Sequence, residues 1–458
     1  MKVHRTRSVR RPVVTLDGEG LVSHAGAGLL SEMADRSGLT EAMSHAMAGC
    51  GISWHTHDPG VVLTHLAVAI ADGADCLSDL AVLREQAELF GPVASQATAW
   101  RAIEAVTAPE LRGIAAAMAT ARGRVWAAAP GGGPAGLTID FDATLVIAHS
   151  DKQDAAPTYK RGFGFHPLGV WCDETNEPLA AMLRPGNAGA NNAADHVALL
   201  GEAIAGLPAE HRAGHDVGDD PAAVVHPILV RADSAGATHG FVAALRSRNI
   251  AFSLGYAIDG RVRNGLLLVQ EEHWEPAVNA DGSRRRDAFV AELTDLVDMD
   301  QWGESTRLIC RRERPHPGAQ LSLFDTAEGW RHTCFITNTA GPDIAGLEVR
   351  HRAHARVEDR VRNWKNTGLA NLPFEDFVRN QAWVAASLLA SCLLAWTQLV
   401  CLDGDLAVAE PKTLRYRLLH VAARLATRGR QLHLRIDRTW PWRHQLAHAY
   451  HRLRHALP

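Results

Sequence analysis

The 458-residue sequence lacks several features that would assign a protein to a class at once. It has 7 cysteines, and no two of them form a Cys-x-x-Cys pair, which argues against a disulfide framework or a zinc ribbon and favours buried thiols in a reducing compartment. Basic residues are not in excess, because 47 Lys and Arg stand against 51 Asp and Glu. The overall charge therefore gives no sign of a nucleic-acid partner, and local charge must supply any such evidence. No internal repeat is evident.

Long apolar runs are also scarce. The N-terminal segment is basic but has no apolar stretch behind it, so we interpret it as a basic arm and not as a secretory signal. Its basic residues are Lys2, Arg5, Arg7, Arg10 and Arg11. Only the run from Ala382 to Cys401 has the length of a membrane span without a charge. Serine, threonine and glutamine interrupt this run and no second span exists, so we expect a helix buried in a protein core and no membrane association.

The pattern of the chain changes after a linker rich in glycine and proline, at 127–136. Before the linker, apolar residues recur at every third or fourth position, which is typical of helices. After it, short alternating or apolar segments predict strands, and two longer segments predict helices. The strands are expected at 137–148, 164–172, 177–183, 227–231 and 250–256, and the helices at 192–205 and before 248. Hairpin strands followed by strands that alternate with helices predict a mixed α/β sheet.

We therefore divide the chain into six regions, on the basis of pattern and composition. They are a basic arm at 1–25, a helical region at 26–126, the first part of an α/β domain at 137–260, a polar insertion with short strands at 261–342, the second part of the α/β domain at 343–405, and a basic helical C-terminal region at 406–458. The last region contributes a basic helical face, made of Arg443, His444, His448, His451, Arg452, Arg454 and His455.

A helix-turn-helix is one interpretation of the helical region. The segment from Leu77 to Leu89 predicts a first helix, a Phe-Gly-Pro turn follows, and Ser95 is suited to cap a second helix. The second helix of such a motif enters the major groove of DNA, where it would present Gln96, Trp100 and Arg101. An ordinary helical hairpin produces the same pattern, so both interpretations stay open.

Carboxylates stand at the strands of the α/β domain. Asp140 and Asp142 are two positions apart on the first strand, so both project from one face of it. A carboxylate pair on an apolar strand is costly to bury and calls for a metal ion or another cation. Asp233 ends a later apolar strand, at the edge where α/β sheets hold ligand groups. Each of these aspartates also has an ordinary explanation as a turn residue.

A third polar group precedes the apolar run. Its members are separated by three, four, four and three positions, which predicts one shared helical face. They are His351, His354, Glu358, Arg362 and Lys365. A solvated charged face has the same spacing, but a helix that leads into a buried run must lie close to the core.

Taken together, these motifs resemble the DDE transposases of bacterial insertion sequences, in the group with a tyrosine, arginine, glutamate and lysine signature. Asp142-Ala143-Thr144 matches the first motif, Asp233-Ser234-Ala235-Gly236 matches the second, and Glu358 is followed after six residues by Lys365 as in the third. The segments GFHPLGVW, MLRPGNAGANNAADH and GVVLTHLAVAIADGADCLSDLAVLREQAELFG add to the resemblance, which covers about residues 20 to 450. The sequence departs from the signature at His351 and His354, where the group has tyrosine and arginine, and this leaves their roles open.

The resemblance implies a ribonuclease-H-like catalytic core with a β-rich insertion, preceded by an all-helical DNA-binding domain. Asp142, Asp233 and Glu358 would be the catalytic residues and would hold two Mg²⁺ ions, or Mn²⁺, with Asp140 as an alternative ligand on the first strand. Phosphate contacts would come from Lys365, Arg362, Arg356 and Arg352. The implied partners are double-stranded DNA, both element ends and target, and further copies of the chain in a dimer or larger oligomer, in the bacterial cytoplasm.

Three alternatives remain. A non-catalytic DNA-binding protein would use only the helix-turn-helix, and a degenerate transposase would bind element ends without cutting them. The segment His55-Thr56-His57-Asp58 also matches a pattern found in metal-dependent small-molecule hydrolases. That pattern needs a preceding apolar strand to direct its ligands, whereas Gly-Ile-Ser-Trp precedes it here and a helical segment follows.

Overall fold

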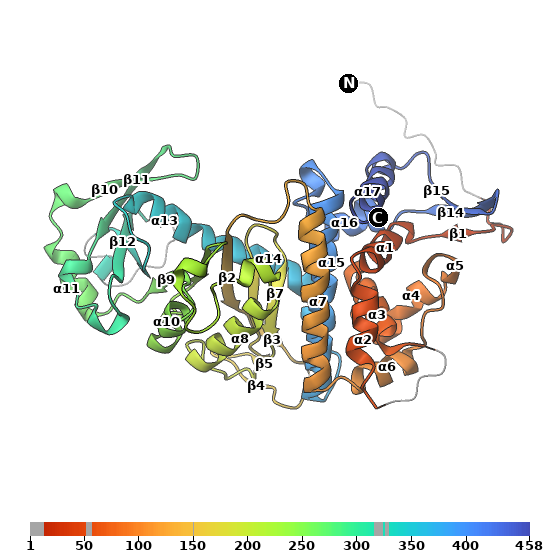
Figure 1. The fold of residues 1–458 in the computed structure, drawn as a ribbon, viewed down its shortest axis with the longest axis horizontal. Helices are drawn as coiled ribbons and strands as arrows, with labels where there is room; N and C mark the ends of the chain where they lie inside the picture. Colours follow the sequence, from red (N-terminus) through yellow and green to blue (C-terminus); the bar gives the residue numbers. More distant parts are fainter. Residues whose placement is uncertain (1–12, 52–56, 150, 316–323, 326–328) are drawn as a thin grey trace, which may run out of the picture.

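The computed structural model describes residues 13–51, 57–149, 151–315, 324–325 and 329–458. The molecule is elongated, with a bundle of helices at one end, a large sheet in the middle and a smaller strand-rich part at the other end (Figure 1). Helices α7 (Ala108–Ala128) and α15 (Phe377–Cys401) stand between the helical end and the sheet (Figure 1). These two helices join the ends of the molecule into one continuous core.

The helical end is built around a single apolar helix. Its α-helices before α7 are α1 (Gly28–Arg36), α2 (Leu39–Met47), α3 (Pro59–Asp72), α4 (Ala81–Arg84), α5 (Ala87–Phe90) and α6 (Gln96–Glu104). Helix α3 begins with Pro59 after the N-cap Asp58, whose side chain accepts a hydrogen bond from the Val61 amide. It packs against α2, α6 and α15, so residues more than three hundred positions later complete the helical core.

Helix α15 confirms the prediction of a buried helix for the long apolar run. Among the described residues it is the one helix long and apolar enough to span a membrane, but 78% of its most apolar window is buried inside the protein. It contacts α1, α3, α7, α17 (Arg443–Ala456) and strand β7. Its apolar surface is therefore covered by other parts of the protein on several sides.

The described residues include a sheet of nine strands in the order β10-β11-β12-β13-β9-β8-β2-β6-β7. The central strands are β2 (Leu137–Ala143), β6 (Leu168–Cys172), β7 (Pro178–Met182), β8 (Ile228–Ala232) and β9 (Ala251–Tyr256). Strand β2 pairs antiparallel with β6 on one side and parallel with β8 on the other, and β8 continues parallel to β9. The predicted mixed α/β sheet is confirmed.

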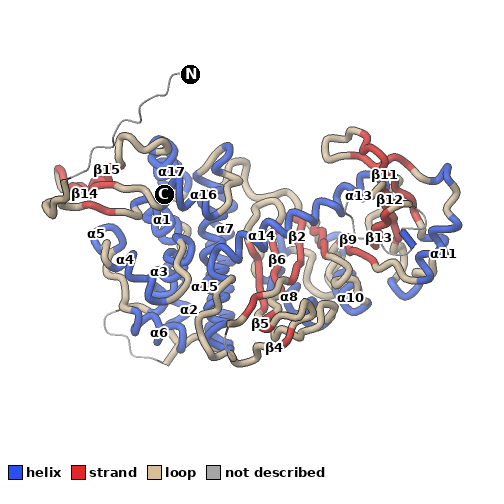
Figure 2. Tube along the Cα trace, turned by 180° about the vertical axis from the view of Figure 1, so that it is seen from behind, coloured by secondary structure: helices blue, strands red, loops and turns tan. Residues whose placement is uncertain are grey.

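Helices cover both faces of the central strands. On one face lie α8 (Ala193–Ala205) and α10 (His239–Arg246), and on the other α14 (Val357–Trp364) crosses β2 and β6 (Figure 2). Phe141 packs on Phe241 of α10, with ring centroids 5.2 Å apart. Since neighbouring residues of a strand point to opposite faces, Asp140 and Asp142 point toward α14.

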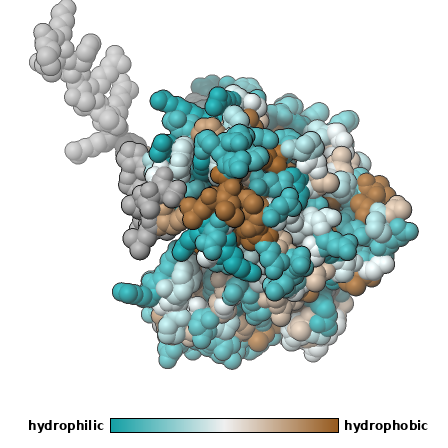
Figure 3. Space-filling model, turned by 90° about the vertical axis from the view of Figure 1, so that its left-hand side faces the viewer, coloured by the Kyte–Doolittle hydropathy of each residue, from teal (hydrophilic) through white to brown (hydrophobic). Residues whose placement is uncertain are grey.

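The insertion extends this sheet beyond β9. It contains α11 (Gly260–Leu268), β10 (Glu275–Val278), β11 (Arg284–Glu292), β12 (Arg307–Glu313) and β13 (Arg331–Thr337). Helix α13 (Ile344–Arg352) covers these strands and closes a small second core with residues such as Val290, Ile309 and Phe335. The outer face of this end shows apolar side chains among polar ones (Figure 3), and Leu267 and Leu268 of α11 are 62% and 65% exposed.

The C-terminal region differs from the prediction of continuous helix. Strands β14 (Ala423–Arg428) and β15 (Gln431–Ile436) form a hairpin before α17, and β14 also pairs with the short strand β1 (Leu21–Val22). Gly429 and Arg430 form its two-residue turn, with φ of 58° and 64°. This pair of positive φ angles fits the right-handed twist of a hairpin. The prediction was wrong because arginine gives no turn signal at this position.

The first helix of the predicted helix-turn-helix is not continuous. A 3₁₀ turn at Leu77–Leu80 and the short helices α4 and α5 replace it, with a break at Gln86. The Gln86 amide group donates to the Val82 carbonyl and accepts from the Ser23 amide, so its side chain links this break to the N-terminal segment. The predicted cap of the second helix is confirmed, because the Ser95 hydroxyl accepts from the Thr98 amide at the start of α6.

Candidate active site

Two of the predicted carboxylates lie at neighbouring strand ends. Asp142 is near the end of β2, and Asp233 directly follows β8. The parallel register pairs Phe141 with Ala232, so the next residue on each strand is one of the two aspartates. Adjacent strands are about 4.8 Å apart, which places the two carboxylates side by side at one edge of the sheet. The Asp233 carboxylate also accepts a hydrogen bond from the Ala235 amide, which fixes the turn after β8.

The third carboxylate, Glu358, comes from the first turn of α14. Burial, together with the negative charges of Asp233 and Glu358, raises the pKa of Asp142 to about 6, and the neighbouring His354 opposes the shift. Asp142 therefore lies close enough to Asp233 and to Glu358 to be repelled by the charge of each. The predicted triad is therefore grouped around Asp142, although its three carboxylates do not all lie within 4.8 Å of one another.

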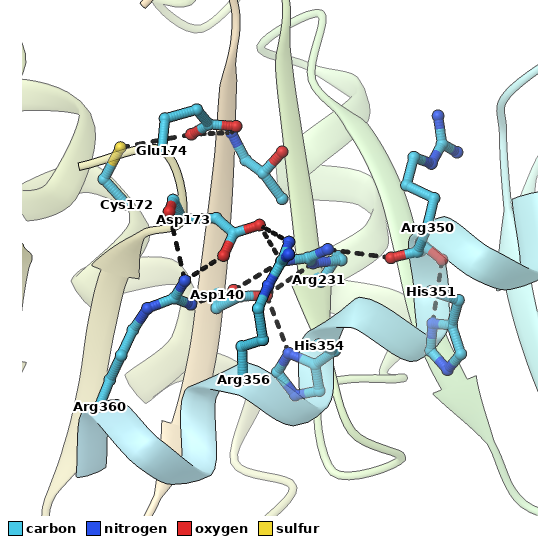
Figure 4. A network of polar contacts seen from close by, with 12 residues as sticks. Asp140, Cys172, Asp173, Glu174, Arg231, Arg350, His351, His354, Arg356 and Arg360 are labelled. Carbon is cyan, nitrogen blue, oxygen red and sulfur yellow. Dashed lines mark hydrogen bonds and ion pairs between the residues drawn. The ribbon is translucent and has the colours of Figure 1, made fainter. Parts of the chain in front are cut away.

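Asp140 lies next to this triad but is fully buried in an ion-pair network (Figure 4). Arg231 of β8 binds its carboxylate with two nitrogens, at 2.7 Å and 2.8 Å. Arg360 of α14 donates to it at 2.7 Å, and the His354 ring is hydrogen-bonded to it at 2.9 Å. Although burial opposes the shift, the hydrogen bonds from His354 and Arg231 lower the pKa of Asp140 to about 2. Its lone pairs are thus engaged by protein cations.

This network sets the position of Glu358. His354 precedes Glu358 by four residues and Arg360 follows it by two, so both sides of the Glu358 turn are fixed to β2 through Asp140 (Figure 4). A second anchor is Asp173, which follows β6 and is bonded by Arg360, Arg231 and Arg356. Buried charge pairs of this kind hold one geometry because any displacement leaves a charge unpaired.

The two histidines that depart from the resemblance have different surroundings. His351 stacks on Phe335 of β13, with ring centroids 4.4 Å apart, and its Nδ1 is 3.0 Å from the Ser253 hydroxyl. Burial and the neighbouring His354 lower the pKa of His351 to about 3, which keeps the ring neutral. His354 instead contacts Asp140 and lies close enough to Asp142 to lower its pKa. His351 packs α13 on the insertion, and His354 belongs to the acidic site.

The predicted single helical face is interrupted. A 3₁₀ turn at Ala353–Arg356 separates α13 from α14, and a tighter helix changes which side chains share a face. His354, Glu358 and Lys365 surround Asp142, whereas His351 faces β13 and Arg362 pairs with Asp359 and Glu410. The shared-face prediction is therefore correct for three of its five members.

Two lysines lie beside the acidic site. Burial lowers the pKa of Lys365, as does the neighbouring charge of Lys160, while the charge of Asp142 opposes the shift. Lys160 is exposed in the loop between β4 (Ala156–Pro157) and β5 (Phe163–Phe165), where its ammonium lies 5.6 Å from the centre of the Tyr159 ring. Lys160 was not predicted from the sequence. The available signal was the Tyr-Lys-Arg-Gly sequence of this turn, which combines an aromatic side chain with two cations.

Three arginines predicted to contact phosphates are engaged by protein groups. Arg352 donates to the Val278 carbonyl at 2.7 Å, Arg356 pairs with Asp173, and Arg362 pairs with Asp359 and Glu410. Arg356 and Arg362 keep 59% and 54% of their side chains exposed. None of these three contacts is with the carboxylate triad. Their role in DNA binding stays a prediction.

The predicted contact residues of α6 are partly exposed. Gln96 and Arg101 lie on the surface, and Trp100 is 40% exposed. One edge of the Trp100 ring packs on Phe374, with centroids 5.2 Å apart, and Arg379 lies 5.1 Å from the ring centre. Helix α6 is thus attached to the start of α15, and its outer face is open.

The histidine motif of the hydrolase alternative lies partly outside the described residues, because the description resumes at His57 after a gap that includes His55. Within the described part of the chain, His57 belongs to no group of three metal-ligating side chains. That alternative gains no support from the structure.

The fold and the site thus define an acidic site, suited to bind cations, at the ends of neighbouring strands in a mixed sheet. The sequence model described as "Transposase DDE domain group 1" matches residues 4–458, and the chain belongs to this family. It is a DNA-cleaving and DNA-transferring enzyme of the DDE type, and enzymes of this type use divalent metal ions.

Other comparisons are less specific. No curated protein matches the chain. Among solved structures, the chain is similar to a piggyBac transposase in a synaptic complex with hairpin DNA. The TM-score is 0.44 at 10% sequence identity, over 84% of this chain and 80% of that chain. The family assignment rests on the sequence match alone.

Proposed function

We propose that the protein binds the ends of its mobile element, cleaves the DNA there and joins the 3′ ends to target DNA, with Asp142, Asp233 and Glu358 as catalytic residues. The observation that carries this proposal is that Asp142 and Asp233 end two paired strands, with Glu358 of α14 close enough for its charge to act on Asp142. Three acids at one edge of a sheet repel one another unless a cation lies between them. The proposal keeps the predicted triad and leaves out Asp140, the alternative ligand predicted on β2.

The residues fit a hard divalent cation. The possible ligand atoms are carboxylate oxygens, which suit Mg²⁺ or Mn²⁺ better than zinc. A bound cation would also relieve the repulsion that Asp142 experiences from the neighbouring acids. Two metal ions bound by these three residues would activate the attacking oxygen and stabilise the leaving oxygen of a phosphate ester. Asp140 is excluded from the donor set because two arginines and a histidine engage it.

The remaining residues position the acids and the DNA. Asp140, Arg231 and Arg360 hold α14 against the sheet, which fixes Glu358 opposite the strand ends. Lys365 and Lys160 place two positive charges beside the site, where they would neutralise the phosphates that flank the scissile bond. His354 would keep its ring fixed through Asp140 and moderate the charge of Asp142.

The finer assignments belong to the same proposal. The strand order β7-β6-β2-β8-β9, antiparallel on one side of β2 and parallel on the other, supports a ribonuclease-H-like core. The open face of α6 supports a DNA-binding role for the helical end. We further propose a bacterial insertion sequence as the source, a dimer or larger oligomer on DNA, and a cytoplasmic location at the nucleoid.

The test is strand cleavage with Mg²⁺ on DNA that carries the native element ends. We expect cuts at the ends with Mg²⁺ or Mn²⁺, none with EDTA, and none by Asp233→Ala protein. DNA with scrambled ends serves as the control for specificity. Unchanged cleavage by Asp233→Ala protein would refute the site assignment. Short inverted repeats that bracket the gene in genomic DNA would independently support the function.

Metal binding to the triad should depend on pH through Asp142. Its pKa is raised to about 6 in the folded protein, so the folded state holds this proton more tightly than the unfolded state does. The resulting stabilisation is present below the ordinary value of 3.8 and is lost as the pH rises through about 6. A divalent cation should offset that loss where Asp142 is ionised. We expect saturating Mn²⁺ to raise the melting temperature clearly at about pH 7.5 and little at about pH 5.

Differential scanning fluorimetry measures this effect. Asp142→Asn protein provides the control, because it should show a weaker Mn²⁺ effect with no such pH dependence. Equal Mn²⁺ stabilisation of the wild type at both pH values would contradict the role of Asp142.

The two lysines should contribute to DNA affinity through charge. We expect Lys160→Gln and Lys365→Gln each to weaken binding to element-end DNA and to reduce the slope of log K against log salt concentration by about 1. Titration of labelled DNA at several salt concentrations measures the slope. Lys412→Gln, at an exposed position of α16 (Pro411–Leu414), is the control and should keep the wild-type slope. A wild-type slope in both test variants would show that neither lysine contacts the DNA phosphates.

A further inference from the structure

A second group of potential metal ligands lies at the helical end. His24 precedes the 3₁₀ turn at Ala25–Ala27, Asp72 is the last residue of α3, and His420 follows the helical turn at Arg415–Leu419. One ligand atom from each of the three side chains lies within 4.8 Å of the others. His24 Nδ1 is 2.5 Å from Asp72 Oδ2, and His420 Nε2 is 3.2 Å from Asp72 Oδ1. Three segments that are far apart in the sequence thus converge on one carboxylate.

The carboxylate at the centre of this group is buried and incompletely satisfied. The Asp72 side chain is 4% exposed, and its Oδ1 atom accepts no hydrogen bond of good geometry. The His420 Nε2 atom is instead hydrogen-bonded to the Asp72 backbone carbonyl, at 2.8 Å. The nearby Arg415 donates to the carbonyls of Ala71 and Ile70. The Oδ1 atom thus has an ion-pair partner in His420 but no hydrogen bond of good geometry, and a metal ion between the two atoms would complete its coordination.

We propose that His24, Asp72 and His420 form a site for one divalent transition-metal ion, for which Zn²⁺ is the best fit. Two imidazole nitrogens and one carboxylate oxygen are common zinc ligands, with bonds of about 2.0–2.2 Å. Tetrahedral ligand atoms are then about 3.4 Å apart. The distance between His420 Nε2 and Asp72 Oδ1 already fits that spacing. His24 Nδ1 instead contacts the other carboxylate oxygen, Oδ2, at 2.5 Å, so the His24 ring must shift before the three side chains can share one ion.

A fourth ligand position is available to water. A cavity of about 350 Å³ borders all three side chains and is also lined by Asp79, Val82 and Arg415. His24 and His420 keep 24% and 38% of their side chains exposed, so an ion can reach the group from solvent. The site differs in chemistry from the carboxylate triad, because imidazole nitrogens favour zinc over Mg²⁺.

The ion would connect the two terminal parts of the chain to the helical core. His24 lies two residues after β1, and His420 lies three residues before β14, the strand that pairs with β1. The rings of the two histidines are themselves in contact, with centroids 4.2 Å apart. Zinc at this site would therefore fix the β1-β14-β15 sheet to the end of α3, as a structural ion that takes no part in cleavage.

The test is zinc binding by the full-length protein, measured by isothermal titration with ZnCl₂ and by the visible absorption of the Co²⁺ form. We expect the wild type to bind one more equivalent of Zn²⁺ than Asp72→Asn or His420→Gln protein, and an excess of zinc to raise the melting temperature of the wild type alone, by about 3 °C. His433→Gln is the matched control, because this histidine is exposed on β15 of the same sheet and should leave the extra equivalent intact.

Each outcome decides the proposal. Circular dichroism of the metal-free variants establishes that they are folded, and His24→Gln provides a milder variant if Asp72→Asn protein is not. Equal zinc stoichiometry in the wild type and in a folded variant would overturn the site, as would a wild type that binds no zinc. A protein that binds zinc at this site but does not cleave DNA would instead contradict the proposed role of the carboxylate triad. Failure of one proposal can therefore be distinguished from failure of the other.

Discussion

Glu358→Gln protein is expected to lose strand cleavage by about 10³-fold or more while it keeps its affinity for element-end DNA within about twofold. Glutamine preserves the size of the side chain but removes the negative charge that α14 brings close to Asp142. A neutral amide is a poor ligand for a hard divalent cation, so the loss falls on the chemical step and not on DNA recognition. Single-turnover cleavage and a gel-shift titration measure the two quantities separately.

The adjacent Asp359 offers a matched control for this prediction. It lies on the same turn of α14, but its side chain is 64% exposed and pairs with Arg362. Asp359→Asn protein should therefore cleave at close to the wild-type rate. The assignment of Glu358 would be wrong if both variants lost the same activity, because a general disturbance of α14 would then explain the result.

Asp140→Asn is expected to destabilise the protein by about 3–5 kcal/mol, the largest loss of stability that we predict for a single substitution. The substitution removes the fully buried counter-charge that Arg231 and Arg360 share and leaves both with Asp173 as their one carboxylate partner. Because the pKa of Asp140 is lowered to about 2 by these partners and His354, its contribution is present above the ordinary value of 3.8 and is lost as the pH falls toward about 2. Denaturant unfolding at neutral pH measures the loss.

The control for Asp140 is a surface ion pair. Asp287 pairs with Arg286, and both side chains are largely exposed, so Asp287→Asn should change stability by less than about 1 kcal/mol. The double variant Asp140→Asn with Arg360→Gln should lose less than the sum of the two single variants, since it removes both members of one pair. Strict additivity would show that the two groups act independently.

Much of the α/β part could be predicted from sequence. Its strands carry unbroken apolar or alternating patterns, and the helix predicted at 192–205 is α8, which begins one residue later after the N-cap Asn192. The spacing of Glu358 to Lys365 also predicted one shared helical face, and both residues lie within range of the Asp142 charge. These predictions succeed because the periodicity and the caps are local properties of the chain.

The choice between Asp140 and Asp142 depends on distant residues. Both aspartates point to the same face of β2, so strand periodicity does not separate them. Arg231 and Arg360 separate them, because they engage Asp140 from another strand and from α14. One signal was present in the sequence: Arg231 is a charged residue inside an apolar strand. Such a charge requires a buried partner, so a carboxylate on the neighbouring strand could have been predicted to pair with it.

The sequence did not predict how closely the helical end and the α/β part pack together. The linker at 127–136 is evident in the composition, yet the core continues across it through α7 and α15. Sequence pattern locates a linker but does not reveal which later helix will cover an earlier one.

Helix α15 has a consequence for synthesis of the protein on the ribosome. The apolar surfaces of α3 and β7 emerge early, whereas the helix that covers them begins at Phe377. A nascent chain must therefore keep these surfaces from aggregating until about four-fifths of the polypeptide has been made. A chain that terminates just after Glu358 would carry all three acids but lack this cover, so we expect such fragments to be degraded and not to compete for element ends.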